Sequence, residues 1–345
     1  MHGVKKSTRD DCTNVTEDSK DTEKEVVLLP HPRKWDIVWR EVMIITFLHI
    51  GAVYGTYLFL MEAKWKTCVF AYLMYVATTM GVTIGAHRLW THRAYKAKLP
   101  LRVILLTFFT MAFQYSVVSW VRIHRMHHKY CDTDADPHNA TRGFFFSHVG
   151  WLLIRKHPQV KAHTVDLSDL LDDPILRFQH KYYWWLLVPI CFIVPTYIPT
   201  LWGEQAWIAF NICVCLRQVC TLHAIWLINS AAHMWGNKPY DKHIRPSDIQ
   251  ILSFVAIGDG FHNYHHTFPW DYRSAELGGY SHNLGQLFID MMAKIGWAYD
   301  LKTVPNEFIE KRVKRTGDGT HPVWGWNDPD LSLGDRKASK IKHRR

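Results

Sequence analysis

Residues 67–92 read TCVFAYLMYVATTMGVTIGAHRLWTH, which is 20 residues without a charged side chain followed by a segment that begins with His87 and ends with His92. As an α-helix, 20 residues are about 30 Å long, and this length matches the hydrocarbon core of a bilayer. A second uncharged run of the same length, 42–61, precedes it, and only five residues separate the two runs. We therefore expect a transmembrane hairpin over 42–86.

Two further apolar runs, 182–203 and 206–228, are separated only by Glu204 and Gln205. They predict a second transmembrane hairpin over 182–228. Arg217 lies inside its return arm. A charged side chain within a membrane is costly, so we expect Arg217 to face a polar partner or a cavity.

The composition excludes several classes of protein. A hydrophobic content of 48% in 345 residues excludes a disordered chain, and the seven cysteines form no CxxC pair that would indicate a zinc ribbon. The net charge of +10 comes from Lys and Arg scattered over loops, without a recognition helix, so we expect no nucleic-acid partner. Residues 1–41 are polar and begin without an apolar run, so they predict a flexible tail rather than a cleavable signal peptide.

Two HxxHH motifs stand out among the 22 histidines, because imidazoles at positions i, i+3 and i+4 lie on one face of a helix. Asn229 and His233 would share a face in the same way. His87 and His92 are five residues apart and do not share a face of an α-helix, so we expect the helix to end or turn between them. These groups contain more imidazoles than one ion binds, which predicts two metal ions, and imidazole suits iron, zinc, copper and nickel alike. The nine candidate ligands are His87, His92, His124, His127, His128, His233, His262, His265 and His266.

The other thirteen histidines, among them His49, His138, His148 and His223, show no such spacing. We expect ordinary surface or core roles for them.

The candidate ligands constrain the topology. For the histidine groups to meet, an even number of membrane crossings must separate them. The remaining apolar stretch, 103–121, lies between the first two groups, so we expect an interfacial helix there and four spans in total. With this topology 38 of the 41 Lys and Arg residues lie on the histidine side, which the positive-inside rule places in the cytosol.

Three segments resemble the histidine boxes of membrane acyl-CoA desaturases of the stearoyl-CoA desaturase type, and insect members most. The resemblance covers about 31–330 and includes the stretches 134–139 and 229–233. The three boxes are His87-Arg88-Leu89-Trp90-Thr91-His92, His124-Arg125-Met126-His127-His128 and His262-Asn263-Tyr264-His265-His266.

The resemblance implies an all-α integral membrane fold in which four transmembrane helices, in two hairpins, lie under a cytosolic helical cap. The cap would consist of residues 87–181 and of residues 229–345, which end in a basic tail. It would hold a di-iron site, with two Fe²⁺ ions bound by the nine histidines and Asn229 reaching one iron through a water. Asp134, Asp136 and Asp259 are candidates to hold imidazole N–H groups, with a turn or surface role as the alternative for each.

The same resemblance implies an activity. The family uses O2 and two electrons to remove two hydrogens from the chain of a fatty acyl-CoA, in unsaturated fatty acid biosynthesis. The electrons come from cytochrome b5 and its NADH-dependent reductase. A position in the endoplasmic reticulum membrane follows, with both termini and the active site in the cytosol. We expect a separate electron donor, because the 45 residues after Asp300 are too short for a fused cytochrome b5 domain.

Five substrate-binding residues are carried over from the family. Arg122, Arg155 and Lys156 match basic positions that hold the CoA phosphates, although a basic loop facing anionic lipid would explain the last two. Trp226 matches a tryptophan at the acyl tunnel. Tyr75 lies roughly 18 Å deeper along its span than the first box and matches the position that sets acyl length. Packing alone would also explain either aromatic residue.

Three positions depart from the family. Glu41 and Tyr115 stand where the family commonly has Asn, and Ile123 stands where it usually has Asp. All three lie near the CoA head group in the family, so we expect its binding to be weaker or altered here.

Other functions remain possible at this stage. A related di-iron membrane hydroxylase or sterol oxidase would also use HxxHH boxes, and a catalytically silent homologue fits the three departures. A metal transporter would require ligands within the spans, whereas these lie at span ends and in the cap. Acyl-CoA desaturation, at carbon 9 first among the possible positions, is the interpretation that the surrounding sequence favours.

Overall fold

The computed structural model describes residues 36–324 and Gly334. Most of the predicted N-terminal tail, up to Trp35, lies outside the described residues, as does almost all of the predicted basic tail. The first helix begins at Trp39, so the predicted tail boundary at Glu41 falls inside the helix.

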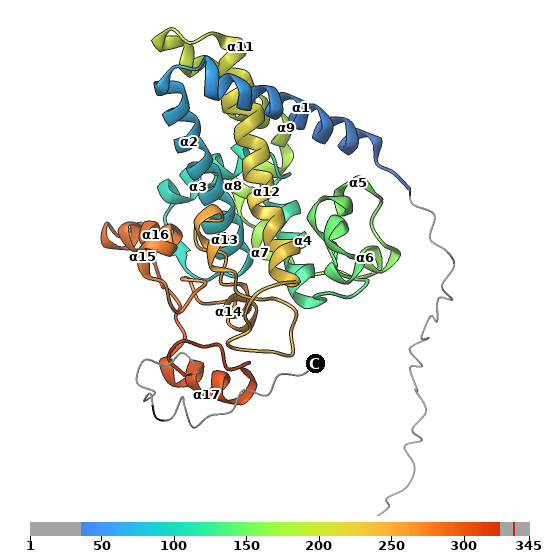
Figure 1. The fold of residues 1–345 in the computed structure, drawn as a ribbon, viewed down its shortest axis with the longest axis vertical. Coiled ribbons are helices and arrows are strands. Elements are labelled where there is room, and N and C mark those ends of the chain that lie inside the picture. The colour runs from blue at the N-terminus through green and yellow to red at the C-terminus, as the bar shows by residue number, and fades with distance from the viewer. Residues whose placement is uncertain (1–35, 325–333, 335–345) are drawn as a thin grey trace, which may run out of the picture. The chain divides into compact units, whose positions relative to one another are not determined.

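Within residues 36–324, four helices are long and apolar enough to cross a membrane, as the sequence predicts. They follow one another in two pairs, with the α1–α2 turn and α11 at the same end in Figure 1. The second and fourth helices run further than the apolar runs alone, to Thr91 and His233. The long helices consist of α1 (Trp39–Met61); α2 (Trp65–Met80) and η1 (Gly81–Thr91); α9 (Tyr183–Leu187), η4 (Val188–Ile193), α10 (Val194–Tyr197) and η5 (Ile198–Trp202); and α11 (Ala206–Ala209), η6 (Phe210–Leu216), α12 (Arg217–Ser230) and η7 (Ala231–His233).

Two glycines let the first and fourth long helices approach closely. Gly51 and Gly55 are four residues apart and face η6. A Cβ atom on Gly55 would lie only 2.3 Å from the carbonyl oxygen of Asn211, and one on Gly51 would lie 2.6 Å from Cys215 Sγ. Small residues at this spacing are a common solution to helix packing in lipid, where no hydrophobic effect drives helices together.

The two hairpin turns are joined by one buried carboxylate. Glu204, at the turn of the second hairpin, accepts hydrogen bonds from the backbone N–H of Lys64 (2.9 Å) and the hydroxyl of Thr67 (2.7 Å) in the first. These donors lie at the N-terminus of α2, where a negative charge is favourable. Glu204 therefore caps one helix and ties the two hairpins together.

The predicted interfacial helix over 103–121 is wrong in its bounds. The structure has two helices there, α3 (Leu99–Met111) and α4 (Val117–Lys129), separated by a short loop. Phe113 and Tyr115 in this loop have φ angles of 52° and 67°, which no helix contains. Because of this break, the axis of α4, which carries the second histidine box, does not have to continue that of α3. The expectation of four membrane-crossing helices is unaffected, because α3 is too short to span.

The second long helix ends at Thr91, between His87 and His92 as expected, but the winding of its last part was not predicted. The helix continues through η1 as a π-helix, in which the backbone N–H of residue i+5 donates to the carbonyl of residue i. The N–H of His92 donates to the carbonyl oxygen of His87 in this way, at 3.1 Å. Residues five apart therefore lie above one another, and the two imidazole rings have centroids 4.9 Å apart.

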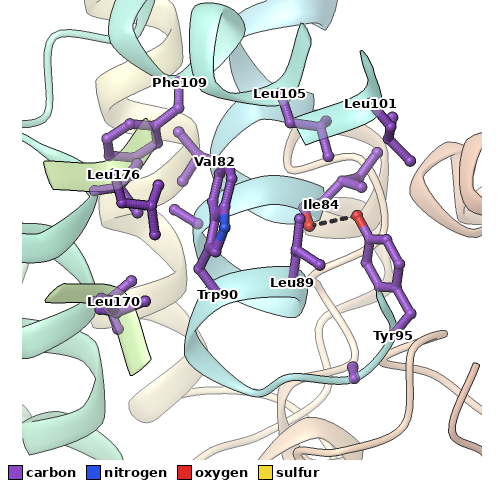
Figure 2. Packing of buried hydrophobic residues seen from close by; sticks show 14 of the residues in the cluster. Val82, Ile84, Leu89, Trp90, Tyr95, Leu101, Leu105, Phe109, Leu170 and Leu176 are labelled. Atoms are coloured by element: carbon purple, nitrogen blue, oxygen red, sulfur yellow. Dashed lines mark hydrogen bonds between the residues drawn. The ribbon is translucent and has the colours of Figure 1, made fainter. Parts of the chain in front are cut away.

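The π-helix is held by packing and by side-chain hydrogen bonds. Val82, Ile84 and Trp90 are buried in the largest hydrophobic cluster, together with residues of α3 (Figure 2). The hydroxyl of Tyr95 donates to the carbonyl oxygen of Ile84 at 3.1 Å, and the hydroxyl of Thr91 donates to that of Ala86 at 2.8 Å. These bonds satisfy carbonyl groups of the unusual winding.

The rest of the described chain forms a helical cap built from two segments of sequence. A two-stranded antiparallel sheet, with Lys96 opposite Tyr299, links the segments. The cap elements are β1 (Lys96–Ala97), η2 (Ala140–Arg142), η3 (Phe146–Gly150), α5 (Trp151–Leu153), α6 (Pro158–Ala162), α7 (Ser168–Leu171) and α8 (Pro174–Lys181), then α13 (Gln250–Val255), α14 (His262–Thr267), α15 (Gly279–His282), α16 (Leu284–Lys294), β2 (Ala298–Tyr299) and α17 (Asn306–Thr316).

The glycine contact between α1 and η6 can be tested by adding one methyl group. We expect Gly55→Ala to destabilise the protein by about 1–3 kcal/mol, because the new carbon overlaps backbone atoms that cannot move away easily. Thermal unfolding of the purified protein in detergent measures this. Val53→Ala is the control, since Val53 is 75% exposed on the same helix. An equal unfolding temperature for both variants would contradict the close approach.

Candidate metal centre

The four histidine groups meet at one end of the long helices, as the sequence predicts. The first box lies on and just after η1, the second on α4, the pair 229 and 233 at the end of α12 and in η7, and the third on α14. The lower end of α12 lies beside α4 and α14 in Figure 1. Elements far apart in the chain thus deliver their imidazoles to one place.

Five imidazoles form a first cluster, in which the ligand nitrogens all lie within 4.8 Å of one another. His265 Nε2 is 2.9 Å from His87 Nε2 and 3.0 Å from His128 Nε2. The Nε2 atoms of His128 and His124 are 3.2 Å apart. The fifth member, His92, has a buried Nε2 without a hydrogen-bond partner in the described part of the chain.

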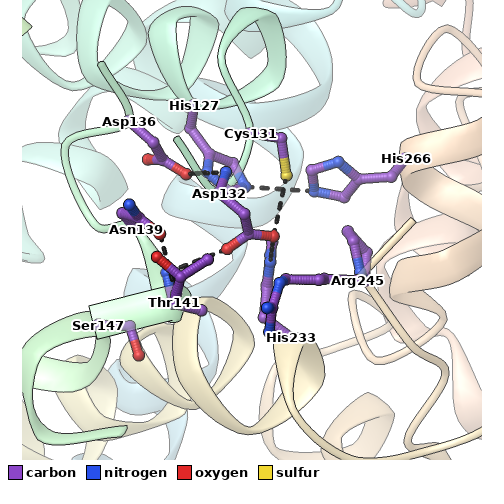
Figure 3. Close-up of polar contacts among 12 residues, drawn as sticks. His127, Cys131, Asp132, Asp136, Asn139, Thr141, Ser147, His233, Arg245 and His266 are labelled. Atoms are coloured by element: carbon purple, nitrogen blue, oxygen red, sulfur yellow. Dashed lines mark hydrogen bonds and ion pairs between the residues drawn. The ribbon is translucent and has the colours of Figure 1, made fainter. Parts of the chain in front are cut away.

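The remaining four imidazoles form a second cluster. His262 Nε2 lies 3.0 Å from His233 Nε2 and 3.1 Å from His266 Nε2, which in turn is 3.3 Å from His127 Nε2. Cys131 lies beside this cluster, between the rings of His127 and His266 in Figure 3, with Sγ within 4.8 Å of three of the imidazole nitrogens. The nine predicted ligands therefore divide into groups of five and four.

Three of these imidazoles have their other ring nitrogen bonded to a carboxylate. A carboxylate only accepts hydrogen bonds, so Nδ1 carries the proton and Nε2 presents a lone pair to the cluster. Such carboxylate–histidine pairs fix the orientation and tautomer of metal-binding imidazoles. The pairs are His87 with Asp259 at 2.8 Å, His127 with Asp136 at 2.8 Å, and His233 with Asp132 at 2.9 Å.

The sequence identified two of these three carboxylates. Asp136 and Asp259 were among its candidates, but the third candidate, Asp134, is exposed, and Asp132 takes the place proposed for it. Acidic residues alternate along 132–136, so the sequence offered no means of telling which of them turn inward.

Arg88 is a further residue that sequence reasoning missed. It is 1% exposed, and its guanidinium donates to Asp259 Oδ1 at 2.7 Å and to the carbonyl oxygen of Tyr272 at 3.1 Å. Its place directly after His87 was the only available signal. Arg88 therefore holds the carboxylate that holds the imidazole of His87.

The electrostatics of the site favour neutral imidazoles. Burial, aided by the neighbouring imidazoles, lowers the pKa of His92, His124 and His128 well below the usual range. Burial alone would raise the pKa of Asp136, but His127 and the other imidazole beside it hold that pKa below its ordinary value. These three rings are thus uncharged and Asp136 is ionised, which is the combination that binds a cation.

The arrangement fits metal ions in both clusters. Two nitrogens bound to one ion at right angles, each about 2.1 Å from it, would be about 3.0 Å apart, close to the separations described above. His87 and His233 cannot donate from Nε2, because their protons are on Nδ1. A cation between the converging nitrogens explains why these lone pairs face the cluster.

An apolar cavity of about 1130 Å³, mouth included, leads to the clusters. Its wall is formed by side chains of α1, η1 and α12, including Leu48, Val82 and Trp226, and its inner end by imidazoles of both clusters and by Asn229. Pockets that bind small molecules have this character, mostly apolar with a few polar groups at defined points. The cavity can therefore hold a hydrocarbon chain against the metal centre.

A polar recess lies at the mouth of this cavity and shares part of its lining with it. Glu41, Tyr115 and Ile123, the three departures from the family, line both spaces. Burial raises the pKa of Tyr115 to about 12, and the charge of Glu41 adds to this effect. Glu41 itself is paired with Arg40, whose Nη2 lies 2.6 Å from Oε1. The negative charge that Glu41 adds at this position is thus largely balanced by the guanidinium of Arg40.

The structure separates the five predicted substrate-binding residues. Arg155 and Lys156 line the recess, and Trp226 lines the apolar cavity. Arg122 is exposed and lines neither space. Tyr75 also lies outside the cavity lining, and its hydroxyl donates to the carbonyl oxygen of Val255 at 2.6 Å.

His138 has a more specific place than its lack of pattern suggested. It is 3% exposed, lines the inner part of the cavity, and its ring centroid is 4.3 Å from that of His127. Burial lowers its pKa to about 3, so its imidazole is neutral.

Comparisons with known proteins agree with the geometry. The family model described as fatty acid desaturase matches residues 63–288. The chain is 53% identical over 317 residues to an acyl-CoA Delta-9 desaturase of Acheta domesticus, covering 91% of this chain and 88% of the relative. It is 50% identical to an acyl-CoA Delta(11) desaturase of Trichoplusia ni, covering 90% of each, and 51% identical to a stearoyl-CoA desaturase 5 of Bos taurus, covering 83% and 85%.

The carboxylates behind the imidazoles give a test of the metal centre. We expect Asp136→Asn and Asp259→Asn each to lower metal affinity about 10- to 100-fold, because an amide neither fixes the imidazole tautomer nor supplies the negative charge. Metal content after dialysis against a chelator measures the loss. Asp134→Asn, at an exposed position, is the control and should keep its metal. Full retention in all three variants would contradict this role.

Proposed function

The chain belongs to the fatty acid desaturase family, and we propose that it is an acyl-CoA desaturase, which introduces a double bond into the chain of a saturated fatty acyl-CoA. The observation that carries the proposal is the apolar cavity that ends at the two histidine clusters. The curated relatives are named for desaturation of acyl-CoA, which supports the same substrate class.

The proposed reaction takes one hydrogen from each of two adjacent methylene carbons. O2, two electrons and two protons are consumed, and the products are the double bond and two molecules of water. We propose two Fe²⁺ ions as the cofactor, one in each histidine cluster, with Asn229 reaching one of them through a water. When bound, the iron ions supply the activation of O2 that an unreactive C–H bond requires.

The protein's own task is placement, because a methylene pair offers no polar group to hold. Leu48, Val82 and Trp226 confine the chain on the sides and exclude water from the reacting carbons. The nine imidazoles, three of them fixed by carboxylate partners, define where along the chain the reaction takes place. We propose that Tyr75, which matches the position that sets acyl length in the family, limits the chain length that is accepted.

We further propose that the recess binds the CoA head group. Arg155 pairs with Asp36 at 2.6 Å, while the ammonium nitrogen of Lys156 is enclosed and lies 4.0 Å from the centre of the Trp151 ring. Among the residues that the structure describes, this nitrogen has no hydrogen-bond partner. A phosphate would supply the missing acceptor. Arg122, exposed on α4, would add a second cation at the surface.

The electron donor and the location are proposed together. The chain is a multi-pass membrane protein, and the placement of its basic residues supports a cytosolic cap in the endoplasmic reticulum membrane, with both termini on that side. A cytosolic cap would meet cytochrome b5 and its NADH-dependent reductase, which deliver electrons one at a time. We propose carbon 9 first for the double-bond position, because the relative with 53% identity is named for Delta-9 desaturation. Carbon 11 is the next candidate, since a relative with 50% identity is named for Delta(11) desaturation.

Expression in yeast that lacks its own desaturase tests the activity. We expect growth without added unsaturated fatty acids and new monounsaturated acids, whose double bonds mass spectrometry locates. His265→Ala is the matched inactive variant, since it removes a ligand of the first cluster. Wild-type protein that is present in membranes and loaded with iron, yet produces no unsaturated acid, would overturn the proposal.

The pH dependence of substrate binding tests the role of Lys156. Burial lowers the pKa of its ammonium group to about 7, so the side chain is a cation below pH 7 and loses its charge above it. We expect the affinity for palmitoyl-CoA to fall about tenfold as the pH rises from 6.5 to 8.5, as one charge-assisted contact is lost. Lys156→Arg should bind equally well at both pH values, because a guanidinium stays charged. The same fall in both proteins would exclude Lys156 as its cause.

A further inference from the structure

The sequence analysis left one intramembrane charge without a role. Arg217, at the start of α12, is 2% exposed and lies deep in the fourth long helix. Within the described part of the chain it forms no ion pair, but its polar contacts are extensive. The expectation that it faces polar partners is thus confirmed, and one of those partners is the last residue of another helix.

The guanidinium of Arg217 lies at the C-terminus of α3. Its Nη1 donates to the carbonyl oxygen of Met111, the last residue of that helix, at 3.2 Å, and its Nε donates to the carbonyl of Cys213 at 2.7 Å. The next residue, Gln218, donates from Nε2 to the carbonyl oxygen of Ala112. The last carbonyl groups of a helix carry a partial negative charge and lack partners within the helix. Arg217 supplies the matching positive charge at this buried helix end.

The position held in this way is the start of the cavity wall. Directly after Ala112, the consecutive residues Phe113, Gln114 and Tyr115 all line the apolar cavity. Phe113 and Tyr115 have φ angles of 52° and 67°, a conformation that aromatic residues rarely adopt. Such a backbone persists only where its surroundings impose it. The contacts of Arg217 and Gln218 impose the position at one end of the loop.

The other end of the loop leads into the metal centre. The loop runs into α4, whose residues His124, His127 and His128 are three of the nine candidate ligands. Trp120 of the same helix donates from Nε1 to Gln114 Oε1 at 3.1 Å. The distance between the cavity wall and these imidazoles therefore depends on a short segment fixed at both ends. A shift of about 1 Å in such a segment changes which atoms of a bound chain reach the reacting position.

We propose that Arg217, with Gln218, is a positioning residue that sets the shape of the acyl cavity and thereby selects chain length and double-bond position. The inference rests on the proposed function, since it concerns how an acyl chain is held. Arg217 does not touch the substrate, because it does not line the cavity. It acts through the backbone of residues 111–116.

The test uses full-length protein in the yeast strain described above and in detergent. Arg217→Met keeps the length of the side chain but removes its charge and donors, Arg217→Lys keeps the charge, and Gln218→Leu removes only the contact with Ala112. Cys220→Ala, at an exposed position on the same helix, is the control. Three quantities are measured: iron per protein, the ratio of monounsaturated products by chain length and double-bond position, and the thermal stabilisation by acyl-CoAs of different chain lengths without an electron donor.

We expect Arg217→Met to keep its iron, to lose activity about 10- to 100-fold, and to change both the product ratio and the chain length that stabilises it best. Arg217→Lys should restore part of the wild-type ratio, and Cys220→Ala should match the wild type throughout. Iron-loaded Arg217→Met with the wild-type product ratio and chain-length profile would overturn the inference. If Arg217→Met cannot be recovered from membranes, Gln218→Leu decides by the same comparison. Wild-type protein that neither forms products nor is stabilised by any acyl-CoA would contradict the proposed function itself, and the inference with it.

Discussion

Nine imidazoles converge inside this protein, several with Nε2 atoms about 3 Å apart, and three of them present a lone pair inward while Nδ1 donates its proton to a carboxylate. This geometry shapes the surroundings of the site. Asp132, Asp136 and Asp259 accept the outward protons, and Arg88 neutralises and orients Asp259 in turn. The polar cap can be regarded as a set of acceptors arranged behind the ligands. Without a cation at the centre such an arrangement would be unfavourable, which is why the geometry itself indicates metal ions.

The features that depend on composition and helical periodicity were predictable from the sequence. The four membrane-crossing helices follow from uncharged runs of about 20 residues, and the two HxxHH boxes follow from the spacing of a helical face. The topological argument that residues 103–121 cannot cross the membrane was correct, although the helix it assumed is broken at Ala112. Patterns that repeat along one element are visible in a single sequence because they do not depend on the rest of the fold.

Features that depend on contacts between distant segments could not be predicted. Nothing in the sequence distinguishes Asp132 from Asp134, since only the direction of the turn after α4 decides which carboxylate meets His233. The π-helical winding at His87 was missed because an α-helix was assumed.

The π-helix has a consequence for how sequence and position are related along the second long helix. Its turns take in more residues than α-helical turns, so every residue after it is rotated about the helix axis relative to an uninterrupted α-helix. The direction of the ligand-bearing side after Gly81 is therefore not fixed by the α-helical periodicity that sets the lipid-facing and protein-facing sides before it. A single residue deleted between Arg88 and His92 would change no chemical group at the metal centre, yet it would turn one ligand of the first box away from the other. In this segment, the number of residues determines how the two imidazoles of the first box face each other, whatever the identity of the residues between them.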